Sequence, residues 1–419
     1  MTLFNRFFSR RNALKAGAPV LLGLAGAASA DEAAAVPAPF PARIGEQGVL
    51  NADVAYGNFL RWVPKEHWPG IASGETDYYA DDALRDMTLS CAATGDEALL
   101  PRGRIRLRNT WHVWSGSHEV IAVKIRGYGG RTGTGIVSVL RNTWIDGSEL
   151  RDRPIINIEM ARGVELRGLA ITGPNARPHE RAAAATRWEP DRARWIGEGC
   201  SNGRHNPQCG IAIDAYGGAA DATKDGYPEP ERYGQHTGNG SSGIRLADIS
   251  ISDCVVGLVD SPSWTNALGD LVDCAGIDLR NNAVCFACGN SNIFNFHFSA
   301  ANNAATAHTF FDSESYGLGH GCIPHFDRFN IGNMYQLFQC GGVAPSPALI
   351  QHCYAEGICR IGSFGIFNQG SAALEQRCSV RFQACHFLFY GKEFDGRHAA
   401  MLCESLGNIE FTECKLGLA

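Results

Sequence analysis

Short β-branched segments that return roughly every 20 to 35 residues are the feature that most limits how this chain can fold. In each segment apolar and polar residues alternate over roughly three to five positions, and a polar turn and then Cys or Gly follow. Such alternation is typical of half-buried strands, and a return at regular intervals indicates a solenoid of stacked coils. The clearest segments are "GIRLADISISDCVVGLV" (243–259), "DRFNIGNMYQLFQCGG" (327–342), "ALIQHCYAEGICRIGSFGIF" (348–367), "CSVRFQACHFLFYG" (378–391) and "GNIEFTECKLG" (407–417).

The length of the chain also favours a repeat. It has 419 residues, more than one globular core usually accommodates, and 45% of them are hydrophobic, enough for an ordered interior. No long 3.6-residue periodicity runs through the repeats, which excludes helical solenoids. A β-sandwich is the main competitor, but sandwiches usually have longer strands and clearer hairpin turns.

Four cysteines end a strand in the same manner, in "ISDC", "IQHC", "FQAC" and "FTEC" (Cys254, Cys353, Cys385 and Cys414). Equivalent positions of stacked coils lie about 4.8 Å apart, and a small, readily buried thiol suits an interior ladder at such a corner. The fifteen cysteines also leave disulfides open as an alternative. A zinc site is a weaker interpretation, because the C-x-x-C at 285–288 has no second pair at zinc-finger spacing.

The N-terminal part resembles a known family. The segments "DYYADDALRDMTLSCAATGDEALLPRGRIRL" (77–107), "VKIRGYGG" (123–130) and "PIINIEMARGVELRGLAITGPN" (154–175) are similar to the opening of right-handed parallel β-helix proteins of the pectate lyase-like superfamily. The resemblance implies a capping helix over 79–91, a strand over 98–107 and one all-β domain over 77–419. It further implies an exterior groove for an extended polysaccharide, which many superfamily members cleave by β-elimination or hydrolysis.

Two polar stretches, 174–208 and 217–242, interrupt the strand rhythm and predict long loops. Guanidinium groups pair with carboxylates in a forked geometry, and indole rings provide apolar faces for sugars. The first stretch therefore supplies candidate substrate-binding residues. They are Arg177, Arg181, Trp188, Arg192 and Trp195.

The densest set of acid–base side chains lies in "HTFFDSESYGLGHGCIPHFDR" (308–328). In a strand, residues two apart share a face, so His308, Phe310 and Asp312 are expected to point the same way. If Phe311 points inward, His308 and Asp312 project outward along one rib. Tyr316 and His320 follow on a glycine-rich loop, and Arg328 is a further binding candidate. Elimination from a uronate requires a base, an acid and a positive charge for the carboxylate, and this set contains all three.

Hydrolysis would instead require two suitably spaced carboxylates. The segment 260–279 is faintly similar to polygalacturonases, through Gly269-Asp270 and a later "GHG" at 319–321, but the expected Asp pair is missing. Asp270 with Asp312 is thus the rival catalytic pair. A glycan-binding protein without catalysis is the third hypothesis. No metal set is predicted, calcium is left open as a cofactor, and both a monomer and a homotrimer are compatible with the sequence.

Residues 1–30 have the pattern of a cleavable export signal, with a basic start, a short apolar middle and a small-residue end. Arg10-Arg11 resembles a twin-arginine signal, although Ala13 stands where an aromatic residue is usual. We therefore expect a periplasmic or secreted protein with an N-terminal extension over 31–76 and no stable membrane insertion. Cleavage would remove four cations and no acid, taking the formal charge from −6 to −10, which disfavours nucleic acid as a partner.

Overall fold

The structure is a computed structural model of the chain. It describes residues 51, 53–115, 119–129, 142–151, 153–174, 186–189, 194–197, 208–214, 240–260, 269–282, 284–288, 291–302, 309–312, 323–340, 348–364, 379–389, 401–403 and 408–418. For several strand residues, among them 309–312, only the backbone is described. The described residues all belong to one compact unit, Ala42–Ala419.

Parallel strands stack on three faces, and each turn of the chain, here called a coil, passes through the three faces in order. The first face consists of β1 (Ala98–Leu99), β4 (Lys124–Arg126), the first parts of β7 (Glu165–Thr172), β11 (Ile244–Ser252) and β13 (Gly269–Arg280), and β15 (Ser291–His297), β18 (Ile323–Asp327), β20 (Ala348–Gln351), β22 (Ser379–Gln383) and β25 (Asn408–Thr412). The second face consists of β2 (Gly103–Arg106), β5 (Thr143–Asp146), the later parts of β7, β11 and β13, β16 (Ala300–Asn302), the first parts of β19 (Asn330–Cys340) and β21 (Tyr354–Phe364), and β23 (His386–Phe389) and β26 (Lys415–Leu418).

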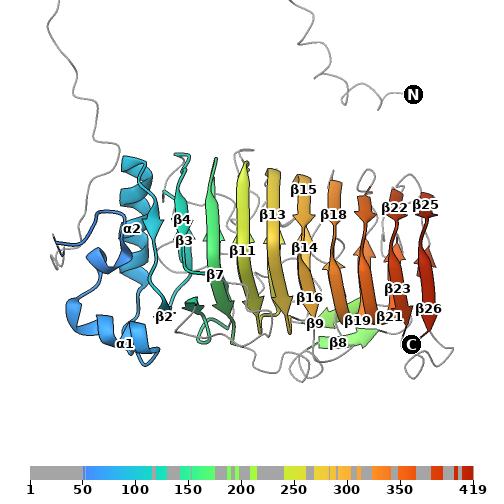
Figure 1. The fold of residues 1–419 in the computed structure, drawn as a ribbon, viewed down its shortest axis with the longest axis horizontal. Helices are drawn as coiled ribbons and strands as arrows, with labels where there is room; N and C mark the ends of the chain where they lie inside the picture. Colours follow the sequence, from blue (N-terminus) through green and yellow to red (C-terminus); the bar gives the residue numbers. More distant parts are fainter. Residues whose placement is uncertain are drawn as a thin grey trace, which may run out of the picture. The chain divides into compact units, whose positions relative to one another are not determined.

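The third face consists of β3 (Trp111–Val113), β6 (Pro154–Ile158), β10 (Cys209–Ile213), β12 (Val256–Asp260), β14 (Val284–Cys288), β17 (Thr309–Asp312), the later parts of β19 and β21, and β24 (Met401–Cys403). Neighbouring strands run side by side along the stack (Figure 1). The chain is a right-handed parallel β-helix, as the sequence predicts.

The corner between the first and second faces is made by single residues with left-handed backbone. Phe298, Arg328, His352 and Ala384 have φ between 49° and 54° at this corner of four successive coils. One such residue redirects the chain without breaking the parallel ladder. In other coils one strand continues through a corner at a residue with positive φ: β7, β11 and β13 pass this corner at Gly168, Asp248 and Gly276, and β19 and β21 pass the corner between the second and third faces at Asn333 and Gly357. These five strands run for 8 to 12 residues, and the predicted strand length of three to five residues is wrong there.

Three of the four predicted ladder cysteines occupy this corner. Cys353, Cys385 and Cys414 each follow the left-handed residue, and the Sγ atoms of Cys385 and Cys414 lie 3.4 Å from carbonyl oxygens of the preceding coil. Cys254 is the exception and corrects the prediction, because it follows the left-handed Asp253 at the corner between the second and third faces. The nine cysteines whose side chains the structure describes are free thiols.

Inward side chains fill the coils. Phe296 and Phe326 are partners in register and stack with ring centroids 5.5 Å apart, and Phe382 and Phe411 stack at 4.8 Å in later coils. Each coil thus buries apolar area against the next. Since the interior is packed, a ligand has to bind to the outside of the coil.

Short helices cover the N-terminal end of the stack. They are η1 (Phe59–Trp62), η2 (Lys65–His67), α1 (Trp68–Ser73) and α2 (Asp81–Thr94). Leu84 and Met87 of α2 are fully buried in the core, and Trp111 Nε1 of the first coil donates to Thr88 Oγ1 at 3.1 Å. The predicted capping helix is confirmed. The strand predicted over 98–107 is instead divided into β1 and β2, because the chain turns a corner around Pro101.

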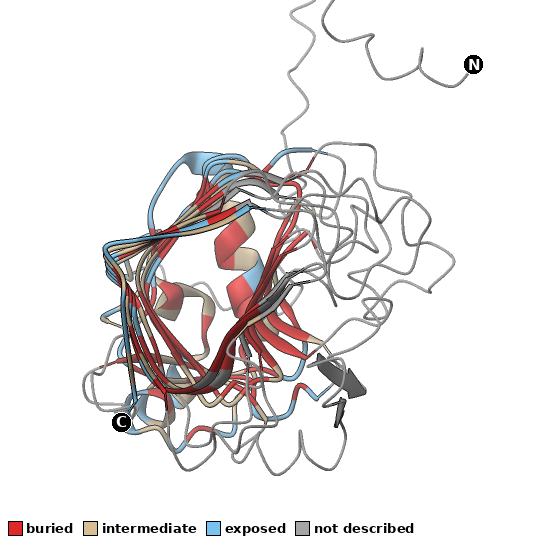
Figure 2. Cartoon of the chain, turned by 90° about the vertical axis from the view of Figure 1, so that its right-hand side faces the viewer, coloured by how far each residue is buried: buried red, intermediate tan, exposed pale blue. Residues whose placement is uncertain are grey.

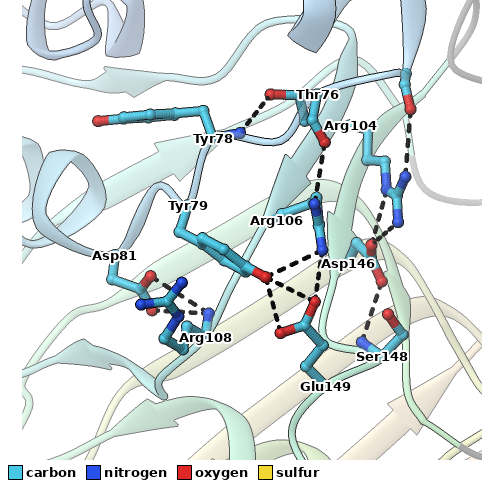
Figure 3. Close-up of polar contacts among 11 residues, drawn as sticks. Thr76, Tyr78, Tyr79, Asp81, Arg104, Arg106, Arg108, Asp146, Ser148 and Glu149 are labelled. Atoms are coloured by element: carbon cyan, nitrogen blue, oxygen red, sulfur yellow. Dashed lines mark hydrogen bonds and ion pairs between the residues drawn. The ribbon is translucent and has the colours of Figure 1, made fainter. Parts of the chain in front are cut away.

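Polar contacts fasten this cap to the first coils (Figure 3). Tyr79 donates through its hydroxyl to Glu149 Oε1 at 2.8 Å, and Arg106 donates to the Tyr79 hydroxyl at 3.1 Å. The guanidinium groups of Arg106 and Arg108 lie 4.7 and 4.2 Å from the centre of the Tyr79 ring. These interactions join the segment before α2 to strand β2 and to the turn after β5.

We predict that Gly103→Ala destabilises the fold by about 2 kcal/mol more than Gly163→Ala. Both glycines have positive φ, +119° and +76°, so both substitutions introduce backbone strain. A Cβ at position 103 would also lie 2.1 Å from the carbonyl oxygen of Ile71 in α1, whereas nothing lies within 4 Å at position 163. Urea denaturation followed by circular dichroism measures the difference; equal midpoints for the two variants would contradict the α1–β2 contact.

Candidate functional site

The long connections of the chain attach to the edges of the third face. From β7 onward the corner between the first and second faces is one or two residues long. By contrast, the connections over 173–208, 214–243, 261–268, 313–322, 341–347, 365–378 and 390–400 all lead onto or off the third face. Binding and catalytic residues occur disproportionately on connections held by a rigid scaffold. The topology therefore favours the third face as the functional one.

Outward positions of the third face change from apolar to polar along the stack. One row in register reads Cys209, Val256, Val284, Thr309, Gln336 and Arg360, and the next reads Asn157, Ala212, Val259, Ala287, Asp312, Gln339 and Ser363. The apolar members from Cys209 to Ala287 belong to a hydrophobic cluster separate from the main core. From β17 onward both rows are polar, and we call Thr309, Asp312, Gln336, Gln339, Arg360 and Ser363 the polar strip.

Two members of the polar strip are buried polar side chains. Gln336 is fully buried and Arg360 is 1% exposed, and the two are direct partners in register. A buried guanidinium is costly unless it is paired and hydrogen-bonded, and Arg360 does have interaction partners. In Figure 2 the strands on one side of the coil are buried throughout, and the strands on the other side carry exposed residues. Sequence reasoning missed Gln336 and Arg360, because their pairing across 24 positions follows only from the register.

At β17 the structure describes the register of the backbone, and the expected alternation of its side chains stays a prediction. Phe311 is the partner of Phe286 and Phe338, which both lie in the main core, whereas Asp312 is the partner of Ala287 in the outer cluster. Asp270 is the second residue of β13, on the first face at the edge that follows the third face. The backbones of Asp270 and Asp312 thus approach the same edge of the coil, in consecutive coils.

Most of the other predicted site residues lie outside the described residues. They are His308, Tyr316, His320, Arg177, Arg181 and Arg192. Trp188 and Trp195 lie in a two-stranded antiparallel hairpin, β8 (Thr186–Glu189) with β9 (Arg194–Gly197), where they are direct partners. Their proposed contact with a sugar stays a prediction.

Arg328 lies away from the polar strip, at the corner between the first and second faces. Its guanidinium is 4.5 Å from the centre of the Phe298 ring, and its Nη2 is 3.2 Å from Asp327 Oδ2. Asp327 Oδ1 is also 3.0 Å from His352 Nδ1. Partial burial raises the pKa of Asp327, but the His352 hydrogen bond and the Arg328 charge lower it by more. The pKa of Asp327 is therefore below its usual value.

A second histidine pair lies beside Asp327 on the outer surface of the first face. His297 is the register partner of Asp327, its Nε2 is 3.3 Å from Asp273 Oδ1, and its ring is perpendicular to that of His325 at 5.8 Å. Burial lowers the pKa of His325, and the neighbouring His297 lowers it further, while Asp327 raises it. The acidic partners of His297 come from other coils, so they do not follow from its local sequence.

The described parts of the chain contain neither a ready set of metal ligands nor a membrane-spanning helix. No group of three or more His, Cys, Asp or Glu side chains there is placed to hold a metal ion. No helix among these residues is long and apolar enough to cross a membrane.

Comparison with known proteins adds solved structures of similar fold. No protein-family model matches the chain, and no curated protein matches it. Similar solved structures include endo-xylogalacturonan hydrolase from Aspergillus tubingensis (10% identity, TM-score 0.44, 82% of this chain and 91% of that one) and PfbA, a surface adhesin of Streptococcus pneumoniae (8%, 0.40, 86% and 90%). The Dettilon tailspike protein is another (8%, 0.28, 80% and 65%). The chain is a right-handed parallel β-helix protein, with a polar strip on its third face.

We predict that Asp327→Asn lowers the pKa of His325 further, because the carboxylate stabilises the protonated imidazole. A pH titration of the histidine ring signals by NMR measures this change. Glu410→Gln is the matched control, since Glu410 lies on the outward row of His325 but in a later coil, where it pairs with Arg381 at 2.7 Å. An unchanged or raised His325 pKa in Asp327→Asn would show that this carboxylate does not act on His325.

Proposed function

We propose that the protein is an exported carbohydrate-active protein that binds an extended polysaccharide along its third face and cleaves it by β-elimination. The observation that carries the proposal is the polar strip, where the carboxylate position Asp312 lies in the row next to that of the buried Arg360 and Gln336. The strands that carry the strip are spaced about 4.8 Å apart, so the strip repeats from coil to coil as a polymer repeats from unit to unit.

Elimination from a uronate assigns distinct tasks to these residues. A base removes the C5 proton, the electron pair forms the C4–C5 double bond, the C4–O bond breaks, and the leaving oxygen takes a proton. His308 and Asp312 are the candidates for the base, and Tyr316 and His320 are the candidates for the acid. Arg360 contributes positive potential at the strip, which counters the charge of the uronate carboxylate. Calcium could supply the same charge, but the roles of these residues do not depend on it.

Hydrolysis with Asp270 and Asp312 is the second candidate. It is favoured by one observation, that both residues approach the same edge of the coil in consecutive coils. A pair that hydrolyses a glycosidic bond would require carboxyl groups roughly 5 to 10 Å apart. Glycan binding without catalysis is the third, and its candidate residues for contact with sugars are Trp188 and Trp195, which are register partners in the β8–β9 hairpin.

We predict that the purified protein releases unsaturated products from at least one uronate polysaccharide, detected by ultraviolet absorbance. Asp312→Asn should reduce the rate about 100-fold or more, as expected for a lost proton-transfer group. Asp248→Asn is the matched control, because it removes a carboxylate at a left-handed corner on the other side of the coil, and asparagine tolerates that backbone.

The products separate the three candidates. New reducing ends without unsaturated products would indicate hydrolysis, in which case Asp270→Asn should be as damaging as Asp312→Asn. Binding without either product would leave glycan recognition alone. Full activity in Asp312→Asn would remove the polar strip as the reaction site.

We also propose that residues 1–30 direct export by a twin-arginine-like route to the periplasm or the medium. We predict that the exported protein begins after Ala30, which mass spectrometry of the intact chain would show. Replacing Arg10 and Arg11 together by Lys should retain the uncleaved protein in the cytoplasm, whereas Arg6→Lys, the control, should not. Normal export of the double variant would contradict the twin-arginine route.

A further inference from the structure

Charged side chains on the outer surface of the first face form an alternating ladder. Lys124 is the register partner of Glu165, Glu165 of Arg245, and Arg245 of Asp273. Arg245 therefore lies between strands that carry an acid at the neighbouring position, and Lys124 has such an acid on one side. Opposite charges directly across a strand pair are stabilising, so this row compensates itself.

The adjacent outward row breaks this rule. Arg126 and Arg167 are direct register partners on β4 and β7, so two cations face each other across a strand spacing of about 4.8 Å. The next positions of the same row are Leu99 on one side and Ala247 on the other, and neither carries a charge. Like charges directly opposite each other are destabilising. This row therefore lowers the stability of the sheet, whereas the adjacent row of alternating charges does not.

Both guanidinium groups are accessible. Arg126 and Arg167 are exposed, and neither makes an ion pair or a side-chain hydrogen bond within the described part of the chain. Two residues after Arg126, Tyr128 is 59% exposed, and the guanidinium of Arg102 lies 5.0 Å from the centre of its ring. The surface thus combines unpaired cations with an exposed aromatic ring held by a third cation.

We propose that Arg126, Arg167 and Tyr128 form a second glycan-binding site, which takes the acidic groups of a polysaccharide outside the reaction site. Guanidinium groups bind carboxylate or sulfate through forked hydrogen bonds, and the tyrosine ring offers an apolar face to a sugar. The site lies on the first face in the opening coils, whereas the polar strip begins at β17 on the third face. The inference rests on the proposed function only in its choice of a saccharide as the ligand.

Charge distribution favours a short acidic glycan segment over nucleic acid or a membrane surface. The whole chain has a formal charge of −6, and the alternating row beside the arginine pair is compensated, so the positive surface is confined to a few strands. A nucleic-acid or lipid surface would require a broader basic patch.

Isothermal titration calorimetry of the full-length protein tests the site. The probes are polygalacturonate, dextran sulfate, carboxyl-reduced neutral polygalacturonan and a single-stranded oligonucleotide, and the Asp312→Asn background prevents cleavage during the measurement. We expect Arg126→Ala with Arg167→Ala to weaken binding of the acidic glycan about tenfold or more and to reduce its salt dependence. Arg245→Ala is the matched control, as an exposed arginine of the same face that lies between two acids.

Every outcome decides the question. Binding of polygalacturonate alone would identify carboxylate as the ligand group, and binding of dextran sulfate as well would extend the site to sulfate. Equal binding by the double variant, equal binding of the neutral polymer, or equal binding of the oligonucleotide would overturn the inference. A melting temperature of the double variant no lower than that of the parent would show that the arginine pair is not needed for folding.

The two proposals fail in different ways. If wild-type protein cleaves no polysaccharide but binds acidic glycans through the arginine pair, the proposed function fails and this inference holds. If cleavage depends on Asp312 while binding is independent of the arginine pair, the inference fails and the proposed function holds.

Discussion

The parallel ladder between successive coils is the interaction on which the rest of this structure depends. A single left-handed residue at the corner between the first and second faces, such as Arg328 or His352, turns the chain while the ladder continues. Because the register is kept through each corner, inward rows stay inward over many coils, and Phe296 meets Phe326 as Phe382 meets Phe411. The same constraint aligns the outward rows, which are free to carry chemistry.

Local pattern predicted the strands well and the corners less well. Alternation indicates which segments enter the sheet, and the N-terminal resemblance indicated the helix that covers the first coil. The motif around Cys254 looks like those around Cys353 and Cys385, yet it turns a different corner. Since a left-handed residue followed by cysteine suits either corner, the identity of the corner depends on the number of residues in the whole coil, which a local motif does not contain.

The candidate site was predictable only along single strands. Alternation within "HTFFD" suffices to predict that Asp312 and Phe311 face opposite sides, because both residues belong to β17. The proximity of Gln336 to Arg360, or of His297 to Asp327, joins segments 24 and 30 positions apart, and depends on how many residues each connection inserts. The structure divides the stretch 308–328 between the third face, the first face and the corner at Arg328. Side-chain composition alone therefore wrongly suggested that all of its polar residues belong to one site.

A solenoid makes departures from its own pattern informative. Inward positions are constrained by packing in every coil, so a buried polar side chain such as Arg360 on an outward row is not explained by the core. In the row from Lys124 to Asp273 the register places opposite charges on neighbouring strands. Arg126 and Arg167 lie on the same two strands as Lys124 and Glu165 and are similarly exposed, but they have no acid beside them. An anion from outside the chain could therefore neutralise them.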